Sequence, residues 1–251
     1  MNRSRTPSLG DLEVLAVDCQ ATGSRPDSGR LLELGWLPTR AAEHNSTAGS
    51  GEEVLSSLFR VPRRAVIPPQ VLKITGIDPE NLRQAPPGRE VWDRFLRSAR
   101  ETAARSGSEL CPTVIHFRRY EEPLLHRIHD QSPGRQPFPL DIVCTHQIVR
   151  RLLPGLPRKG LRAVAGYFGY SLPERRRSSF HVEATALIWR HLVELLENEP
   201  GVTGFAKLKD WLAVSSGSPS LVPGKRVFPM EKRLREGLPD LPGVYRMYRL
   251  N

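Results

Sequence analysis

Short apolar runs alternate with turn-like segments in the N-terminal part of the chain. Residues 12–17 are apolar and end at Asp18, just before a Thr-Gly turn, which predicts a buried strand that meets a loop. Residues 31–37 and 54–61 predict two further strands, and the Gly/Ser/Asn-rich residues 45–51 separate them. We therefore expect the chain to begin as an antiparallel meander.

Helices alternate with strands in the rest of the chain. Residues 181–197 give the strongest helical pattern, because apolar side chains recur at helical spacing from Ala184 to Leu195. We expect a serine just before this segment, Ser178 or Ser179, to cap the helix. The same reasoning predicts helices at residues 89–105, 121–129, 147–153, 161–168 and 205–214, and strands at residues 112–117 and 140–144.

The composition changes after the last predicted helix. Residues 215–220 contain only Ser, Gly and Pro, which is typical of a linker, and a basic tail follows them. We therefore expect a main domain at residues 11–198, an accessory helix with its linker at residues 199–226, and a separate segment at residues 227–251.

Charge indicates the kind of partner. The chain of 251 residues has 37 Lys and Arg against 27 Asp and Glu, a net charge of +10, which favours a polyanion such as nucleic acid. A merely solvated basic surface is the open alternative. The 3 cysteines form no C-x-x-C pair, so they indicate neither a disulfide framework nor a zinc knuckle and fit a reducing, cytoplasmic location. No apolar stretch reaches the roughly 20 residues of a membrane span, so we expect no membrane partner.

Asp18 is the first residue with candidate chemistry. It lies at the end of a predicted strand, where loops form clefts in α/β sheets, and Gln20 follows on the same face. An acid in this place is a candidate metal ligand, although an Asp before a Thr-Gly turn is as often a turn former. Motifs elsewhere in the chain favour the ligand.

Five strings of residues, in order, carry a resemblance. They are V-D-C-Q-A-T-G at residues 17–23, L-L-E-L-G at 31–35, L-K-I-T-G-I at 72–77, I-H-F-R-R-Y-E at 115–121 and H-V-E-A-T-A at 181–186. They resemble the D-x-E-T-T-G, I-I-E-I-G, L-T-G-I, H-N-x-x-F-D and H-x-x-x-x-D motifs of the DnaQ-like, DEDDh-type 3′-to-5′ exonuclease superfamily. C-T at residues 144–145 with R-R-L-L-P at 150–154 is similar to that family's D-T…A-R-x-L-x-P stretch. The resemblance covers about residues 12–196.

The resemblance implies an α/β, ribonuclease H-like fold: a mixed five-stranded sheet, with three antiparallel and two parallel strands, flanked by helices. It also implies two-metal hydrolysis, in which four carboxylates hold two Mg²⁺ or Mn²⁺ ions and a histidine takes the proton of the attacking water. Carried over position by position, Asp18 and Glu121 are the metal ligands and His181 is the general base. A helix-start histidine without a catalytic role is the open alternative for His181.

The carry-over fails at three positions. Gln20 stands where the motif has Glu, Glu121 where it has Asp, and Ala186 where it has the last Asp. Two carboxylates do not neutralise two divalent cations, so we expect weakened or lost catalysis, with the occupancy by Mg²⁺ or Mn²⁺ in doubt. Glu183 shares a helix face with Ala186 and is an alternative carboxylate, although helical side chains lean towards the N-terminus and away from that position.

We expect nucleic acid, and single-stranded DNA in particular, as the partner. The groove-lining positions of the motifs are Thr22, Thr75, Gly76 and His116. For Thr75 and His116, a role as buried hydrogen-bonding groups is the alternative. The guanidinium groups that flank the expected cleft and suit phosphates are those of Arg118, Arg119, Arg175, Arg176 and Arg177. A solvated basic loop is the alternative for these arginines.

The tail carries a second resemblance. Residues 238–246 read L-P-D-L-P-G-V-Y-R and are similar to the L-P-x-x-P-G-V-Y opening of a GIY-YIG nuclease domain, as in UvrC-like repair endonucleases. The sequence stops at Asn251, before the Y-I-G strand and the Arg and Glu of such a domain, so we expect that activity only with a further module. An ordinary Pro-Gly turn and strand is the alternative.

Three functional hypotheses result. The first is a nucleic-acid-binding protein of DNA repair or processing, with a DnaQ-like fold and weakened or lost catalysis. The second is an active metal-dependent 3′-to-5′ exonuclease that uses a reduced or relocated ligand set. The third is a protein-interaction domain without nucleic-acid binding, whose binding would be insensitive to salt.

Overall fold

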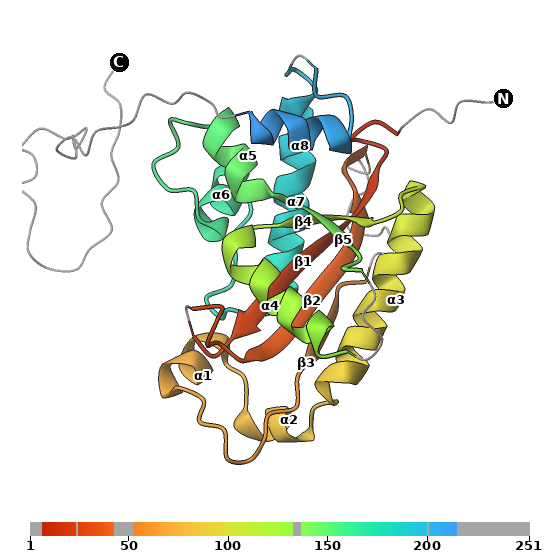
Figure 1. The fold of residues 1–251 in the computed structure, drawn as a ribbon. Helices are drawn as coiled ribbons and strands as arrows, with labels where there is room; N and C mark the ends of the chain where they lie inside the picture. Colours follow the sequence, from red (N-terminus) through yellow and green to blue (C-terminus); the bar gives the residue numbers. More distant parts are fainter. Residues whose placement is uncertain (1–6, 24, 43–52, 133–136, 200, 215–251) are drawn as a thin grey trace, which may run out of the picture. The chain divides into compact units, whose positions relative to one another are not determined.

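A mixed sheet organises the part of the chain that the computed structural model describes, residues 7–23, 25–42, 53–132, 137–199 and 201–214 (Figure 1). It has five strands in the order β3-β2-β1-β4-β5. β1 (Glu13–Ala21) lies antiparallel to β2 (Leu31–Arg40), which lies antiparallel to β3 (Leu55–Leu58). β4 (Cys111–Ile115) lies parallel to β1 and to β5 (Leu140–Cys144). The predicted sheet of three antiparallel and two parallel strands is confirmed.

Helices cover both faces of this sheet. Alternation along β1 divides the core, because Val14 and Ala16 belong to one apolar cluster and Leu15 and Val17 to the other. The second cluster is covered by α3 (Gly88–Ser106) and α4 (Arg118–Asp130). The first is covered by α5 (Thr145–Leu152), α6 (Leu161–Tyr167), α7 (Ser178–Leu196) and α8 (Phe205–Ala213).

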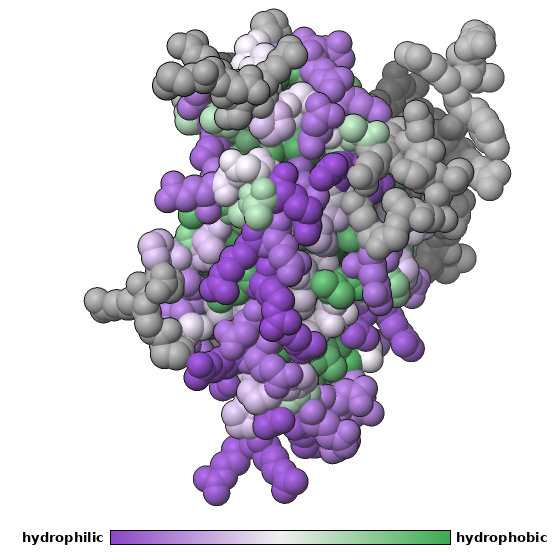
Figure 2. Space-filling view, turned by 90° about the vertical axis from the view of Figure 1, so that its right-hand side faces the viewer, coloured by the Kyte–Doolittle hydropathy of each residue, from purple (hydrophilic) through white to green (hydrophobic). Residues whose placement is uncertain are grey.

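α3 shows why each of these helices turns one of its faces to the sheet and the other to solvent. Val91, Trp92, Phe95 and Ala99 are buried at helical spacing, whereas the residues between them are mostly charged and exposed. Figure 2 faces the side on which α3 lies in Figure 1, and hydrophilic residues dominate that surface. The helix predicted at residues 89–105 is therefore confirmed.

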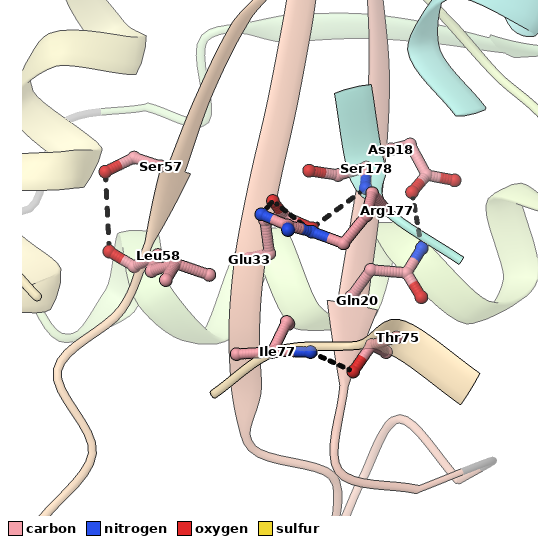
Figure 3. Close-up of polar contacts among 9 residues, drawn as sticks. All are labelled: Asp18, Gln20, Glu33, Ser57, Leu58, Thr75, Ile77, Arg177 and Ser178. Atoms are coloured by element: carbon pink, nitrogen blue, oxygen red, sulfur yellow. Dashed lines mark hydrogen bonds and ion pairs between the residues drawn. The ribbon is translucent and has the colours of Figure 1, made fainter. Parts of the chain in front are cut away.

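Two short helices were not predicted. α1 (Pro69–Thr75) and α2 (Pro79–Gln84) lie at one end of the sheet (Figure 1). Each begins with proline, and the Asp78 side chain accepts a hydrogen bond from the Glu80 backbone N–H at the start of α2. They enclose a small apolar cluster of Leu32, Val61, Ile77 and Leu82. Ile77, which follows α1 (Figure 3), thus packs in the same cluster as Leu32 on β2.

The start of α7 corrects one expectation. α7 begins at Ser178, its N-cap is Arg177, and no side chain forms the cap hydrogen bond. The prediction that Ser178 or Ser179 caps the helix is therefore wrong. The Ser178 backbone N–H instead donates to Glu33 Oε2 on β2, over 2.9 Å. A carboxylate from a distant strand thus satisfies a helix-end donor that a local serine was expected to satisfy.

Gly35 on β2 lets α7 approach the sheet closely. A β-carbon at Gly35 would lie 2.9 Å from Ser178 Oγ and 3.0 Å from the Ser178 carbonyl carbon. Gly35 pairs with Asp18 on β1, so this close approach brings the first turn of α7 against the strand end that carries Asp18.

Two expectations from the sequence concern other parts of the chain. Among the helices that the structure describes, none is long and apolar enough to cross a membrane. The Ser/Gly/Pro linker at residues 215–220 and the segment expected at residues 227–251, with its GIY-YIG-like opening, lie outside the described residues.

Candidate active site

At the centre of the candidate site, three side chains, Asp18, Gln20 and His181, each contact the other two. Gln20 Nε2 donates to Asp18 Oδ2 over 2.8 Å, and His181 Nδ1 lies 3.2 Å from Asp18 Oδ1. Gln20 Nε2 also lies 3.3 Å from His181 Nδ1. Asp18 and Gln20 project from the same face of β1, towards the start of α7 (Figure 3). Both oxygens of Asp18 are thus next to nitrogen atoms of other side chains.

Glu121 brings a second buried carboxylate to this centre. It lies in the first turn of α4 and is only 4% exposed. Its Oε2 atom has no hydrogen-bond partner among the described residues. Burial raises the pKa of Glu121 well above its ordinary value, the negative charge of Asp18 raises it further, and a hydrogen bond with the Cys19 backbone lowers it. The structure thus brings together the three residues predicted to be catalytic.

Burial and neighbouring side chains also shift the pKa of Asp18. Burial raises its pKa above the ordinary value, whereas the hydrogen bond and charge of His181 and the amide of Gln20 lower it. The charge of Glu33 raises it. The adjacent Cys19 is buried in the opposite cluster, and its thiol pKa is raised well above the ordinary value by burial and by the charges of Glu121 and Asp18. Three acidic side chains, Asp18, Glu33 and Glu121, thus lie near one another at this end of β1.

The residues present do not fit a two-metal site. No group of three or more His, Cys, Asp or Glu residues in the described part of the chain is placed to hold a metal ion. The Gln20 amide nitrogen donates a hydrogen bond to the Asp18 carboxylate, whereas hard cations require oxygen ligands. Ala186, at the position of the last motif acid, is 2% exposed and packs in the apolar cluster that α7 forms with β1.

The alternative acid Glu183 is held elsewhere. Its Oε2 atom accepts a hydrogen bond from the Tyr170 hydroxyl over 3.0 Å. Burial and this carboxylate raise the pKa of Tyr170 to about 12. Among the hydrogen bonds of the described residues, Glu183 is bound to Tyr170, whereas Asp18 is bound to Gln20 and His181. These contacts do not support the hypothesis that Glu183 replaces the missing acid beside Asp18.

Glu33 is a key residue that the sequence reasoning missed. Arg177 binds it with its Nε and NH2 groups, at 2.5 Å from NH2 to Oε1, and Glu33 is 1% exposed in this ion pair (Figure 3). An acid inside the apolar run L-L-E-L was the available signal, because a buried charge requires a partner. The Arg177 guanidinium, predicted to suit phosphates, is therefore already paired.

Two predicted groove residues are buried and already hydrogen-bonded. His116 Nδ1 lies 2.9 Å from Thr145 Oγ1, and its Nε2 lies 3.0 Å from the Lys159 carbonyl oxygen. Burial lowers the pKa of His116 to about 4. Thr75 Oγ1 donates to the Val71 carbonyl oxygen over 2.8 Å and accepts from the Ile77 N–H. These contacts match the alternative in which both residues are buried hydrogen-bonding groups.

The other predicted nucleic-acid contacts lie around the centre. Arg176 N–H donates to the Ile74 carbonyl oxygen over 2.8 Å, and the Arg175 side chain packs over Gly76, which is left-handed at the end of α1. The arginines of the predicted loop thus meet the L-K-I-T-G segment. Arg175 and Arg176 are exposed, and so is Arg119 at the start of α4.

Thr22 and Arg118 are engaged within the protein. Thr22 Oγ1 accepts from the Arg30 backbone N–H over 2.9 Å and so stabilises the turn after β1. Arg118 binds both oxygens of Glu122, each over 2.7 Å, and donates to the Ile142 carbonyl oxygen over 3.1 Å. Of the predicted phosphate contacts, Arg119, Arg175 and Arg176 are therefore the most accessible.

Known protein families and sequences include proteins similar to this chain. The model of the RNase_T family, described as exonuclease, matches residues 15–181. The chain is 25% identical over 242 residues, 95% of its length, to a Mycobacterium tuberculosis (strain CDC 1551 / Oshkosh) protein whose name describes a bifunctional exonuclease/endonuclease. It spans about a third (34%) of that relative's length. It is also 25% identical over 202 residues, covering 80% of this chain and 91% of the relative, to the DNA polymerase III subunit epsilon of Aquifex aeolicus (strain VF5).

Solved structures show the same fold. The nuclease domain of 3′hExo, a DEDDh family member bound to rAMP, has a TM-score of 0.58 and 12% identity, over 77% of this chain and 96% of that domain. Exonuclease I of E. coli in complex with a dT13 oligonucleotide has a TM-score of 0.56 and 15% identity, over 79% of this chain and 43% of that enzyme. The predicted ribonuclease H-like fold of the DEDDh exonucleases is confirmed.

Proposed function

The chain belongs to the RNase_T family of exonucleases, with a DnaQ-like DEDDh-type domain, and on that premise we propose that it binds nucleic acid while its two-metal hydrolysis is weakened or lost. Divalent metal ions are the cofactors of this family. When bound, they would supply a hydroxide nucleophile and stabilise the leaving oxygen. This chain retains Asp18, Glu121 and His181 at the centre, but Gln20 and Ala186 lack the charge that two cations require.

One observation carries the proposal: the hydrogen bond from Gln20 to Asp18. In the motif, a glutamate at this position would repel Asp18 and make both acids available to a cation. Gln20 instead neutralises part of the Asp18 charge through a hydrogen bond of 2.8 Å, and His181 lies at the other carboxylate oxygen. The polar atoms of Asp18, Gln20 and His181 thus contact one another, and a cation would have to displace these contacts before it could bind.

Binding of a polyanion is supported by charge and by position. The net charge is +10, and the exposed Arg175, Arg176 and Arg119 lie on the two elements that carry His181 and Glu121 or lead into them. Guanidinium groups in such places bind phosphate oxygens bidentately. Single-stranded DNA is the substrate class we propose, because such contacts fix a flexible backbone without reading its sequence.

A second candidate function rests on Glu121. Glu121 Oε2, which has no hydrogen-bond partner among the described residues, and the neighbouring Asp18 would be the carboxylate ligands of a single cation. In this alternative the chain is an active exonuclease that uses one metal ion, and His181 takes the proton of the attacking water.

The proposed cellular role is DNA repair or processing together with an endonuclease module. The name of the M. tuberculosis relative describes both exonuclease and endonuclease functions, and residues 238–246 resemble the opening of a GIY-YIG domain. In this proposal the exonuclease-like domain presents a DNA strand to that module.

Digestion of a 5′-labelled single strand with Mn²⁺ tests the proposal, with the wild type compared with Asp18→Ala. We expect salt-dependent binding by both proteins and stepwise shortening by neither. Shortening by the wild type that Asp18→Ala abolishes would instead support the one-metal exonuclease. Salt-insensitive association, or none, would overturn the binding proposal and favour a protein-interaction domain.

The double variant Gln20→Glu, Ala186→Asp is the complementary test. It restores the two motif acids, so shortening that depends on Asp18 should appear. No gain, in a protein that unfolds as cooperatively as the wild type, would show that the two replaced acids are not what limits catalysis.

A further inference from the structure

Phe117 is an exposed aromatic ring at the edge of the candidate site. It is 44% exposed, between the buried His116 and α4, which carries Arg119 and Glu121. Its ring lies 4.4 Å from that of His146, centroid to centroid, with the planes inclined by 31°. We call this pair of neighbouring rings the Phe117–His146 shelf.

The backbone of Phe117 adopts a conformation that is unfavourable for a phenylalanine. Phe117 has φ 64° and ψ 51°, and it is the only residue other than glycine with a positive φ in the described part of the chain. The family motif has asparagine here, a residue that adopts this left-handed conformation much more easily than phenylalanine. Strained residues of this kind concentrate at binding and catalytic sites.

The buried His116 ring contacts both rings of the shelf and supports them. The His116 ring meets Phe117 edge-on, with centroids 4.9 Å apart and planes at 85°, and it meets His146 at 5.5 Å and 86°. His116 is itself fixed by Thr145 and by the Lys159 carbonyl group. A pre-positioned aromatic surface loses little conformational entropy when a planar ligand stacks on it.

Two cationic side chains, Arg150 and Lys159, act electrostatically on the His146 ring of the shelf. Burial, followed by the charges of Arg150 and Lys159, lowers the pKa of His146, so this ring is neutral at pH 7. The charge of His181 acts on His116, which places the support of the shelf within electrostatic range of the centre. Neutral rings bordered by cations form the arrangement with which proteins bind single strands, whose bases stack while their phosphates are neutralised.

We propose that the Phe117–His146 shelf stacks a base of a single-stranded nucleic acid whose phosphates are bound by the exposed arginines Arg119, Arg175 and Arg176. The inference rests on the proposed nucleic-acid binding and adds to it the contact that holds the base. It assigns Phe117 as a binding residue that stacks on any base, because every base has a π face.

Three variants at Phe117 test the shelf. Phe117→Leu keeps an apolar side chain but removes the ring, Phe117→Trp keeps an aromatic ring, and Phe117→Asn removes the ring while relieving the backbone strain. Binding is measured by the anisotropy of a 5′-labelled oligothymidine, at several salt concentrations. In parallel, the fluorescence of an oligonucleotide containing 2-aminopurine reports base stacking.

We expect Phe117→Leu and Phe117→Asn to bind about 5- to 100-fold more weakly, and Phe117→Trp to bind as well as the wild type. The salt dependence should be unchanged in all three, because no phosphate contact is lost. Quenching of 2-aminopurine should disappear in the Leu and Asn variants only. Phe117→Asn should be at least as stable as the wild type, so its weaker binding would not result from unfolding.

Matched variants separate this inference from the proposed function. Arg175→Gln with Arg176→Gln should reduce the salt dependence and leave the quenching in place. If that variant weakens binding while Phe117→Leu and Phe117→Asn bind and quench like the wild type, the shelf is overturned and the proposed function stands. If the wild type does not bind the single strand, both are overturned.

Discussion

At the scale of single residues, the buried acids Asp18 and Glu121 make stability depend on pH. Both have folded-state pKa values above their ordinary range, chiefly because of burial. The folded state therefore holds protons that the unfolded chain has already released. The free energy of unfolding consequently falls as the pH rises from the ordinary carboxyl range through the raised pKa values.

Glu121→Gln should stabilise the protein at neutral pH. The substitution removes a buried carboxyl group that the folded state must either protonate or hold charged beside Asp18, so the melting temperature should rise by about 2–4 °C for each kcal/mol relieved. The gain should shrink as the pH falls towards about 4, where the wild-type carboxyl group is protonated in both states. Thermal unfolding across this pH range measures both effects. The control Glu122→Gln breaks a partly exposed ion pair with Arg118 and should cost less than about 1 kcal/mol.

Arg177 should matter for folding more than for phosphate binding. Arg177→Met leaves the buried Glu33 carboxylate without its guanidinium partner, so we expect a loss of about 3–5 kcal/mol in the free energy of unfolding. Adding Glu33→Gln should recover a large part of this loss. Urea unfolding measures both, and the exposed Arg176→Met should stay within about 0.5 kcal/mol of the wild type. Equal losses for the two arginine variants would contradict this assignment.

At the scale of elements, the contact between β2 and α7 positions the start of α7. Gly35→Ala places a β-carbon 2.9–3.0 Å from Ser178, so α7 must move away. We expect a loss of about 1–3 kcal/mol, although alanine in an open strand position would stabilise it. Thermal unfolding checks the sign. Gly155→Ala is the control, since nothing lies within 4 Å of its added carbon, and it should be neutral or slightly stabilising.

Periodicity predicted the long elements because their burial patterns repeat. The helix expected at residues 89–105 is α3, Gly88–Ser106, and the strand expected at 140–144 is β5. α1 and α2 have 7 and 6 residues, which is too few for a periodic pattern to show. The start of α7 was placed too late because Ser178 is held by Glu33, 145 positions earlier in the sequence.

At the scale of the whole molecule, the order of the motifs was enough to predict that distant residues meet. Asp18, Glu121 and His181 come from a strand and two helices and gather at one end of β1. Their catalytic roles remain predictions. The sequence could not show that Gln20 turns its amide to Asp18, or that Phe117 takes a left-handed backbone, because both depend on packing between segments.

Charge balance in the domain should decide whether metal ions stabilise it. Gln20→Glu with Ala186→Asp adds two acids near Asp18 and Glu121, so without metal this variant should unfold more easily than the wild type, by about 2 kcal/mol or more. Mn²⁺ at 100 times its dissociation constant should return about 2.7 kcal/mol. Melting temperatures with and without MnCl₂ measure both effects. Gln147→Glu, on the exposed side of α5, should show neither, and an equal response from it would indicate nonspecific binding.

The burial of Cys19 makes its alkylation rate a measure of how often the end of β1 opens. Its thiol lies on the strand between Asp18 and Gln20, out of contact with solvent, and its raised pKa keeps it protonated. An alkylating reagent can reach it only when the end of β1 separates from its neighbours. With Cys111 and Cys144 replaced by alanine, the alkylation rate divided by that of a free thiol gives the fraction of time that this strand end is open. A bound single strand that holds α4 against the end of β1 would slow the alkylation of Cys19, and one that separates α4 from β1 would speed it.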